Sequence, residues 1–238
     1  MNNQFYIIIL ISFLSQSCDC NSNPSFPFTK EKYLIGMVLS VQDSNYLRYP
    51  FRIRQSDSLL YILDLHGTEY YCHTFTFPKM RQDSSFALRG NGPEEYLSVE
   101  NIRLGSDGVP YLLDANNHSI TIHNSYNQIY NKQIPLSRDL IRCLDFALIN
   151  DSLFLIPDYS GQYRINIVDN SGNIKKQLFH IPTRNKQVPK TPDIVLAQAW
   201  RSFIDYNPVN DILAMVTQLG QVIEIYNLKT NETINILY

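Results

Sequence analysis

Arg54-Gln55-Ser56-Asp57-Ser58-Leu59-Leu60-Tyr61-Ile62-Leu63-Asp64 is the stretch that decides the fold, because its pattern returns 50 residues later as Leu104-Gly105-Ser106-Asp107-Gly108-Val109-Pro110-Tyr111-Leu112-Leu113-Asp114. The pairs Ser-Asp and Leu-Asp and the tyrosine recur at this offset. In both copies a polar turn joins a first strand to a second strand that is apolar on both faces. Such a strand must be covered from two sides.

The same hairpin returns twice more, at residues 150–158 and 210–216, so the chain holds four related units. Each unit continues with a third strand that alternates apolar and polar residues and with a polar turn. The fourth strand is expected to end in an apolar residue followed by proline, at Phe77-Pro78, Ile134-Pro135 and Ile181-Pro182. The repeat therefore supplies four short strands per unit.

Four strands that grade from apolar on both faces to apolar on one face are typical of a propeller blade, whose inner strands lie between neighbouring blades. The spacing of the units also falls in the range of such blades. A β-sandwich would give short strands and turns without the repeated Ser-Asp and strand-proline pattern. We therefore predict an all-β fold, a β-propeller of four-stranded antiparallel blades, with blades at about 46–78, 99–135, 142–182 and 200–238.

The N-terminal residues predict export. Residues 5–14 form an apolar run that is too short to span a bilayer and is typical of a secretory signal. Small polar residues and Cys18 follow, as in a lipoprotein signal. We expect a signal peptide at 1–17, lipid attachment at Cys18, a tether at 18–30 and the propeller at 31–238. A plain cleaved signal, or modification of Cys20, stays open.

One stretch stands outside the repeat: Arg89-Gly90-Asn91-Gly92-Pro93-Glu94-Glu95-Tyr96. Its two glycines would allow positive φ at low cost. Pro93 suits the first position of a helical turn, and the two glutamates would favour a helix N-terminus. A tight turn that enters a short helical segment is expected here.

The signal that ends in a cysteine, the repeated four-stranded units and the stretch 89–96 together resemble the six-bladed β-propeller lipoproteins of Gram-negative bacteria described as TolB-like. Their usual pattern is Arg/Lys-Gly-x-Gly-Pro-Gly-Glu-Phe/Tyr. It is matched here by Arg89, Gly90, Gly92, Pro93, Glu95 and Tyr96, while Glu94 replaces a glycine. The resemblance implies lipid anchoring in the bacterial cell envelope, on a periplasmic or surface face. It does not supply an activity.

The number of blades leaves two alternatives. Six units would need roughly 300 residues, and this sequence holds four. We expect part of a six-bladed ring that lacks its last two blades. In the alternative, four units close a smaller ring, with residues 33–41 as an extra strand that completes the last blade.

Composition and motifs narrow the function. The formal net charge of −2 gives no basic excess for nucleic acid. We expect no metal and no cofactor, because the five histidines fit no zinc motif and there is no Gly-x-Ser-x-Gly elbow. Buried free thiols are expected at Cys72 and Cys143, although a disulfide between them stays open.

Candidate ligand-binding residues are few. Asp114 and Asp158, like Asp64, end second strands and could converge at one face of the ring, or could cap nearby turns. Arg89 could form a ligand rim with the glutamates that follow it, but a role in the architecture of the loop is the favoured alternative. Trp200 ends the long non-repeating segment 183–200, where a loop is often functional, and it could either bind a ligand or pack between blades.

The hypothesis favoured by the sequence is a non-catalytic binding or scaffolding propeller, tethered to a membrane through its N-terminal lipid, whose partner is an envelope protein or a glycan. The rival hypothesis is a lyase or hydrolase that acts on sugars or lactones in the central funnel. A structural spacer is the third. The enzyme hypothesis predicts that two or more of a small set of side chains line one pocket: His66, Asp114, His118, Asp158 and Trp200.

Overall fold

The computed structural model describes residues 32–33, 35–36, 47–123, 132–140, 142–160, 163–181 and 191–237. The chain divides into two compact units, 1–39 and 40–238, and the repeat lies in the second. The predicted signal peptide, Cys18 and the tether lie outside the described residues, as does most of segment 33–41. In the described part of the chain, no helix has the length and apolar character needed to cross a membrane.

Four antiparallel sheets of four strands make up the second unit, and in each sheet the strands neighbour one another in chain order. Blade 1 contains β1 (Pro50–Ser56), β2 (Leu59–Asp64), β3 (Tyr70–Thr76) and β4 (Arg81–Leu88). Blade 2 contains β5 (Val99–Leu104), β6 (Pro110–Asp114), β7 (Ser119–Ile122) and β8 (Lys132–Pro135). Blade 3 contains β9 (Ala147–Asn150), β10 (Leu153–Pro157), β11 (Tyr163–Asp169) and β12 (Ile174–His180). Blade 4 contains β13 (Ser202–Asn207), β14 (Ile212–Thr217), β15 (Val222–Asn227) and β16 (Thr233–Leu237).

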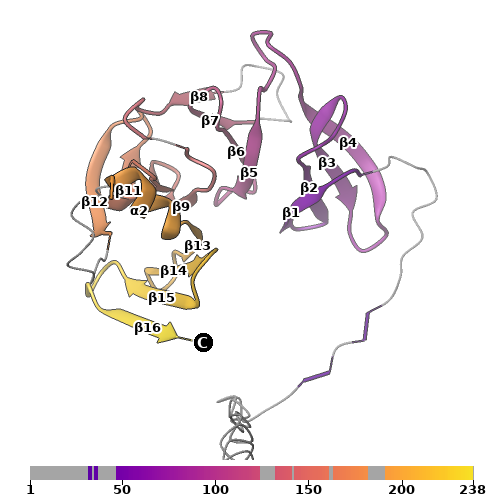
Figure 1. The fold of residues 1–238 in the computed structure, drawn as a ribbon. Helices are drawn as coiled ribbons and strands as arrows, with labels where there is room; N and C mark the ends of the chain where they lie inside the picture. Colours follow the sequence, from indigo (N-terminus) through magenta and orange to yellow (C-terminus); the bar gives the residue numbers. More distant parts are fainter. Residues whose placement is uncertain are drawn as a thin grey trace, which may run out of the picture. The chain divides into compact units, whose positions relative to one another are not determined.

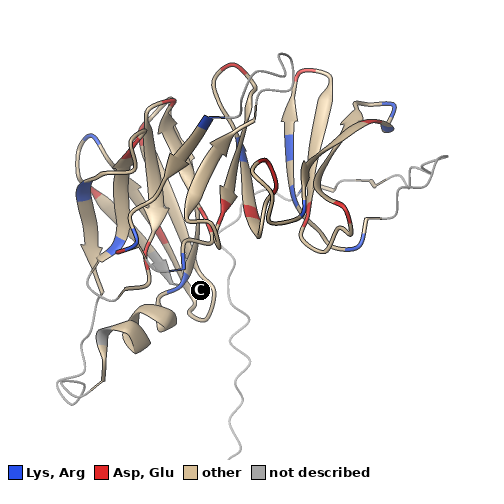
Figure 2. Cartoon of the chain, turned by 90° about the horizontal axis from the view of Figure 1, so that it is seen from above, with Lys and Arg blue, Asp and Glu red and all other residues tan. Residues whose placement is uncertain are grey.

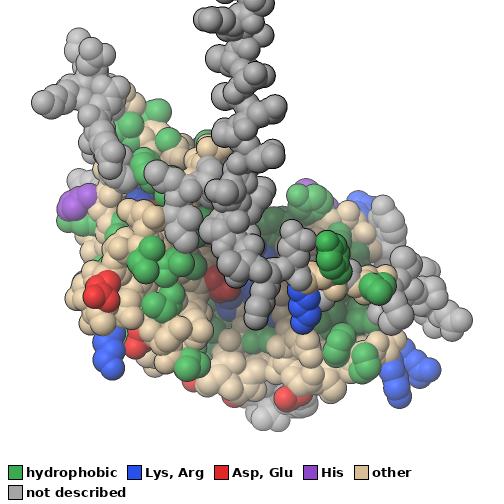
Figure 3. Space-filling model, turned by 90° about the horizontal axis from the view of Figure 1, so that it is seen from below, with side chains coloured by type: hydrophobic (Ala, Val, Ile, Leu, Met, Phe, Trp, Pro, Cys, Tyr) green, Lys and Arg blue, Asp and Glu red, His purple; other side chains and the backbone are tan. Residues whose placement is uncertain are grey.

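The sheets follow one another around a common centre, with the first strand of each sheet innermost and the fourth outermost (Figure 1). This arrangement is a β-propeller with four blades, so the predicted fold class is confirmed. The short helix α2 (Asp193–Ala199) precedes blade 4 and lies outside the sheets (Figure 2). Basic and acidic residues are interspersed over the described blades in the same view. On the face seen from below, hydrophobic side chains lie among basic and acidic ones (Figure 3).

The predicted end of blade 1 is wrong by one strand. Phe77-Pro78 lies in the turn between β3 and β4, so the blade continues to Leu88 instead of ending at 78. The backbone N–H of Phe77 still donates to the carbonyl of Ser58 at 2.6 Å, after which proline has no N–H to continue the ladder. Proline thus ended a strand as expected, but the third strand rather than the fourth. The strands of the other three blades lie within the predicted ranges.

The hydrophobic core lies between blades. Three clusters of buried side chains join blade 1 to blade 2, blade 2 to blade 3, and blade 3 to blade 4. Second strands supply both sides of this packing: Leu112 belongs to the first of these clusters and Leu113 to the second, and both are fully buried. The apolar character of these strands on both faces therefore follows from their place between two neighbours.

Aspartates at the ends of second strands fasten each blade to the segment that enters it. Asp64 accepts hydrogen bonds from the backbone N–H groups of Arg48 and Tyr49, both at 2.7 Å, just before β1. Asp114 accepts equivalent bonds from Leu97 at 2.8 Å and Ser98 at 3.1 Å, just before β5. The carboxylates thus replace backbone partners where the ladder between first and second strands ends.

Asp114→Ala is expected to lower the free energy of unfolding by about 2–4 kcal/mol, because several backbone donors lose a buried charged acceptor. The donors include Leu97, Ser98, Asn116 and Asn117. The measurement is urea unfolding followed by circular dichroism. Asp139→Ala, at an exposed loop aspartate, is the control and should change stability by less than about 0.5 kcal/mol. Equal stability of the two variants would contradict the fastening role.

Candidate functional site

The stretch from Arg89 to Tyr96 forms a turn and no helix, so the predicted helical segment is wrong. Neither Gly90 nor Gly92 has positive φ. They are needed instead because the carboxylate of Glu95 folds back over them and accepts a 2.7 Å hydrogen bond from the N–H of Gly92. A Cβ at Gly90 would lie 1.9 Å from Glu95 Oε2. The glycines therefore make space for a capping carboxylate.

Arg89 is held by the protein itself. Its Nε donates to the hydroxyl of Tyr71 at 2.9 Å, its Nη1 donates to the carbonyl of Gly67 at 3.0 Å, and the guanidinium lies 4.4 Å from the centre of the Tyr71 ring. The Tyr71 hydroxyl in turn donates to the carbonyl of Leu97 at 2.7 Å. Arg89 thus fixes the crossing from blade 1 to blade 2, which is the structural alternative that the sequence left open.

The other predicted ligand-binding residues fall in two places. Asp158 and Trp200 line one hollow, but it has a volume of only about 10 Å³, too small for a ligand. Trp200 is covered there by the guanidinium of Arg164, 4.9 Å from the ring centre. Asp114 lines a separate cavity of about 270 Å³ beside Glu94 and Tyr96. Two of the residues that the enzyme hypothesis names thus line one hollow, Asp158 and Trp200, but its volume leaves no room for a substrate.

The largest of the described cavities lies at the centre of the ring and has a volume of about 630 Å³. The first strands of all four blades line it, together with the turns that follow them. The polar lining residues are Arg54, Gln55, Arg103, Ser106, Asn150, Asp151, Asp205 and Tyr206. Every blade thus contributes to one site, which makes this cavity the candidate functional site.

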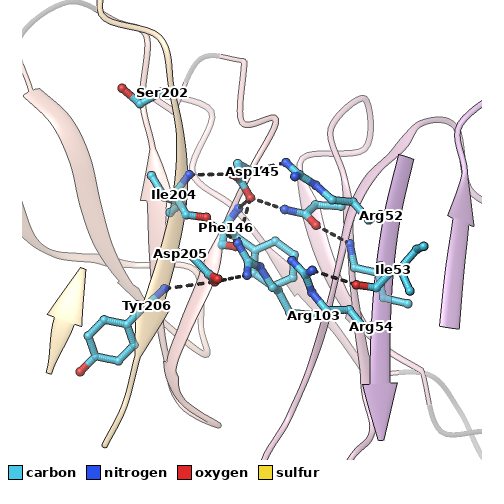
Figure 4. Close-up of polar contacts among 12 residues, drawn as sticks. Arg52, Ile53, Arg54, Arg103, Asp145, Phe146, Ser202, Ile204, Asp205 and Tyr206 are labelled. Carbon is cyan, nitrogen blue, oxygen red and sulfur yellow. Dashed lines mark hydrogen bonds and ion pairs between the residues drawn. The ribbon is translucent and has the colours of Figure 1, made fainter. Parts of the chain in front are cut away.

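Asp145, in the segment that enters blade 3, is 3% exposed and contacts Arg103, which lines this cavity. Its carboxylate lies 3.7 Å from the guanidinium of Arg52 in blade 1 and 3.5 Å from that of Arg103 in blade 2. It also accepts hydrogen bonds from the side chain of Asn101 and from the N–H of Ile204, the latter at 3.0 Å. Figure 4 shows these side chains converging between the sheets.

Arg103 extends this network toward the cavity. Its Nε donates to the carbonyl of Phe146 at 2.8 Å and its Nη2 donates to the carbonyl of Ile204 at 2.7 Å. Its Nη1 forms an ion pair with Asp205 of β13 (Figure 4). The side chain of Arg103 is 9% exposed and that of Asp205 is 75% exposed. The ion pair therefore connects the buried network around Asp145 with an aspartate that is open to the cavity.

The sequence analysis did not single out Arg52, Arg54, Arg103, Asp145 or Asp205. A signal was present, because Arg54 and Arg103 occupy equivalent places: each pairs with the tyrosine of its second strand, Tyr61 in blade 1 and Tyr111 in blade 2. Charged residues in innermost strands, directly before the repeated Ser-Asp turns, could have been recognised as lining the centre of the ring.

The described residues give little support for a metal site or a reactive cysteine. No group of three or more His, Cys, Asp and Glu side chains there is placed to hold a metal ion. Cys72 and Cys143 are free thiols in two different hydrophobic clusters. Burial raises the pKa of both thiols, that of Cys143 to about 12, so neither is disposed to act as a thiolate at neutral pH.

Comparison with known proteins defines the class. The model of the TolB-like 6-blade propeller-like family matches residues 27–238. The chain belongs to this family, as the resemblance predicted, and its described residues form four blades. Comparison with curated proteins finds no match.

Solved structures share the fold. An exported protein of Bacteroides fragilis NCTC 9343 is 13% identical with a TM-score of 0.50, over 84% of this chain and 74% of that one. An auxiliary nutrient binding protein of Bacteroides ovatus ATCC 8483 is 11% identical with a TM-score of 0.53, over 80% of this chain and 42% of that one. A catalytically inactive virginiamycin B lyase of Staphylococcus aureus, solved with quinupristin, is 15% identical with a TM-score of 0.51, over 78% and 54%. The chain thus spans about half the length of the latter two.

Asp145→Asn is expected to lower the free energy of unfolding by about 3 kcal/mol or more, because it leaves two arginines without their buried counter-charge. The measurement is urea unfolding at pH 7. Asp205→Asn removes the same charge from a side chain that is 75% exposed and should cost no more than about 1 kcal/mol. If the two variants lose the same stability, Asp145 does not have the joining role that its contacts indicate.

Proposed function

We propose that the chain is an exported, non-catalytic binding propeller whose ligand occupies the central cavity. The observation that carries the proposal is that one cavity of about 630 Å³ is lined by the innermost strands of all four blades. Its lining combines hydroxyl, amide and carboxylate groups with two arginines, which are the groups that recognise a hydroxylated ligand such as a glycan. A glycan is therefore the partner that we favour over an envelope protein.

The rival function, a lyase or hydrolase that acts on sugars or lactones, has the virginiamycin B lyase among the structures of similar fold. At 15% identity this likeness extends to the fold alone. Among the described residues that line the central cavity there is no histidine, cysteine or glutamate. Of the two aspartates there, Asp205 is paired with Arg103, and Asp151 accepts a hydrogen bond from the Ser106 hydroxyl at 2.9 Å, which supports binding over general acid–base catalysis.

Blocking the cavity tests the proposed function. Gln55→Trp, at an exposed position of β1 that lines the cavity, is expected to weaken glycan binding at least tenfold on an array of neutral and acidic oligosaccharides. Gln218→Trp, exposed in the turn after β14, is the matched control and should bind like the wild type. Equal binding by the two variants would remove the cavity as the site. Cleavage of the oligosaccharides, detected by mass spectrometry, would favour the enzyme.

The proposed location is outside the cytoplasm, in the cell envelope, with the lipid attached at Cys18. The apolar run before Cys18 supports it, and so do the exported and nutrient-binding proteins of similar fold. A binding protein held at a membrane surface by lipid would meet its ligand before uptake. The lipid-modified cysteine supplies more than one acyl chain, as stable anchoring requires.

Cys18→Ser is expected to move the full-length chain from the membrane fraction to the soluble fraction of the periplasm or medium. Cell fractionation with immunoblotting is the measurement, and Cys20→Ser, two residues away, is the control that should stay with the membrane. Retention of Cys18→Ser in the membrane fraction would reject Cys18 as the anchor and direct attention to Cys20 or to the apolar run itself.

A further inference from the structure

Three arginines and two aspartates meet at the central cavity, and three of these five residues line it: Arg54, Arg103 and Asp205. Arg52 and Arg54 come from β1 and Arg103 from β5, whereas Asp145 precedes β9 and Asp205 lies in β13. Figure 4 shows the five side chains directed toward one another from different blades. The cluster as a whole therefore carries one more positive charge than negative.

The two aspartates form ion pairs with two of the three arginines. Arg103 is paired with both Asp145 and Asp205. Arg52 lies 3.7 Å from Asp145, and its guanidinium also lies 5.0 Å from the centre of the Phe203 ring. Each of these cations thus has a carboxylate within ion-pair distance.

Arg54 is the arginine that remains. Its Nη1 donates a hydrogen bond to the carbonyl of the adjacent Ile53 at 3.0 Å, and no carboxylate of the described residues lies within 4.0 Å of its guanidinium. The side chain is half-buried at the cavity wall. Burial lowers the pKa of Arg54, and the positive charge of Arg103 lowers it further, against the opposing effect of Asp205.

A half-buried guanidinium beside other cations is costly unless an anion compensates it. Arginine stays protonated at neutral pH, so the charge is not relieved by deprotonation. Its planar fork can take both oxygens of a carboxylate at once. A single negative charge would balance these five side chains, and Asp151, which also lines the cavity, would repel a further negative charge, so a monoanion is favoured over a doubly charged phosphate.

The surroundings of Arg54 indicate what the rest of the ligand contains. The cavity is much larger than one carboxylate, and Ser106, Asn150 and Tyr206 line it together with the exposed carboxylate of Asp205. The hydroxyls of Ser106 and Tyr206 donate to Asp151 at 2.9 Å and Asp211 at 2.7 Å, so their oxygens keep acceptor capacity for the hydroxyl groups of a ligand. A ligand that joins a carboxylate to a polyhydroxylated ring could therefore bind both the guanidinium of Arg54 and the polar side chains of the cavity.

We propose that the central cavity binds a sugar acid, such as a uronic acid unit of a glycan, with its carboxylate on Arg54 and its hydroxyl groups on the opposite wall. This proposal rests on the proposed function, because it names the ligand class of the same cavity. It assigns to Arg54 a role in selecting acidic over neutral sugars, and to Asp205 a role in accepting hydrogen bonds from the hydroxyl groups of the sugar.

The test is isothermal titration calorimetry with galacturonate and glucuronate against galactose and glucose. The wild type should bind the uronates at least tenfold more tightly than the neutral sugars, and less tightly as the NaCl concentration rises from 50 to 500 mM. Arg54→Gln should lose this preference. Arg54→Lys, which keeps the charge without the fork, should retain part of it. Arg138→Gln, at an exposed arginine outside the cavity, should bind like the wild type.

Thermal melting separates binding from structure. Arg54→Gln should melt at or above the temperature of the wild type, because it removes an uncompensated charge. A lower melting temperature together with unchanged uronate preference would assign Arg54 a structural role and overturn the proposal. Tighter binding of inorganic phosphate than of either uronate would overturn the carboxylate as the recognised group.

The two proposals fail differently. If neutral sugars bind as tightly as uronates, and Gln55→Trp abolishes both, the cavity is a glycan site and the role of Arg54 in selecting acidic sugars is wrong. If Gln55→Trp leaves the binding of both classes unchanged, or if neither class binds, the central cavity is not a sugar site and both proposals fall.

Discussion

The propeller depends on one buried carboxylate. Asp145 stands in the segment that enters blade 3, yet it contacts Arg52 of blade 1, Asn101 and Arg103 of blade 2, and the backbone of Ile204 in blade 4. Hydrophobic clusters join each of the first three blades to the next, but they act between neighbours. The polar centre is where residues from all four blades meet. Because a buried charge must be paired from several sides, it also fixes how the innermost strands face one another.

The residues of this polar centre that stabilise the fold also hold the groups of the candidate site in place. Arg103 is bound below to Asp145 and to two backbone carbonyls, and above to the exposed Asp205. A ligand in the cavity would therefore meet groups whose positions are set by buried contacts. Preorganisation of this kind lowers the cost of ordering a binding site. By contrast, Arg89, Asp114 and Trp200 are engaged by the protein at the crossings between blades, where they hold the frame around the site.

The predicted and observed architectures agree where a local pattern has one physical solution. Second strands such as Leu112-Leu113 are apolar on both faces because a blade packs on each side of them, and their sequence showed this directly. The end of blade 1 was predicted wrongly at Phe77-Pro78 because a proline can end any antiparallel strand of a blade, the third as well as the fourth. The stretch Gly90-Asn91-Gly92 was found by its composition, but its glycines serve the close approach of Glu95 rather than positive φ.

The repeat, the blade and the family could be predicted from the order of the amino acids, because strand periodicity and turn residues are local properties of a chain. The residues of the site could be recognised only once the blades were placed in space. Arg54, Arg103, Asp145 and Asp205 lie far apart in the sequence and belong to different blades, so no spacing marks them as partners. Their chemistry arises because the innermost strands converge on one centre, where burial and mutual charge act on side chains that are unremarkable in each strand alone.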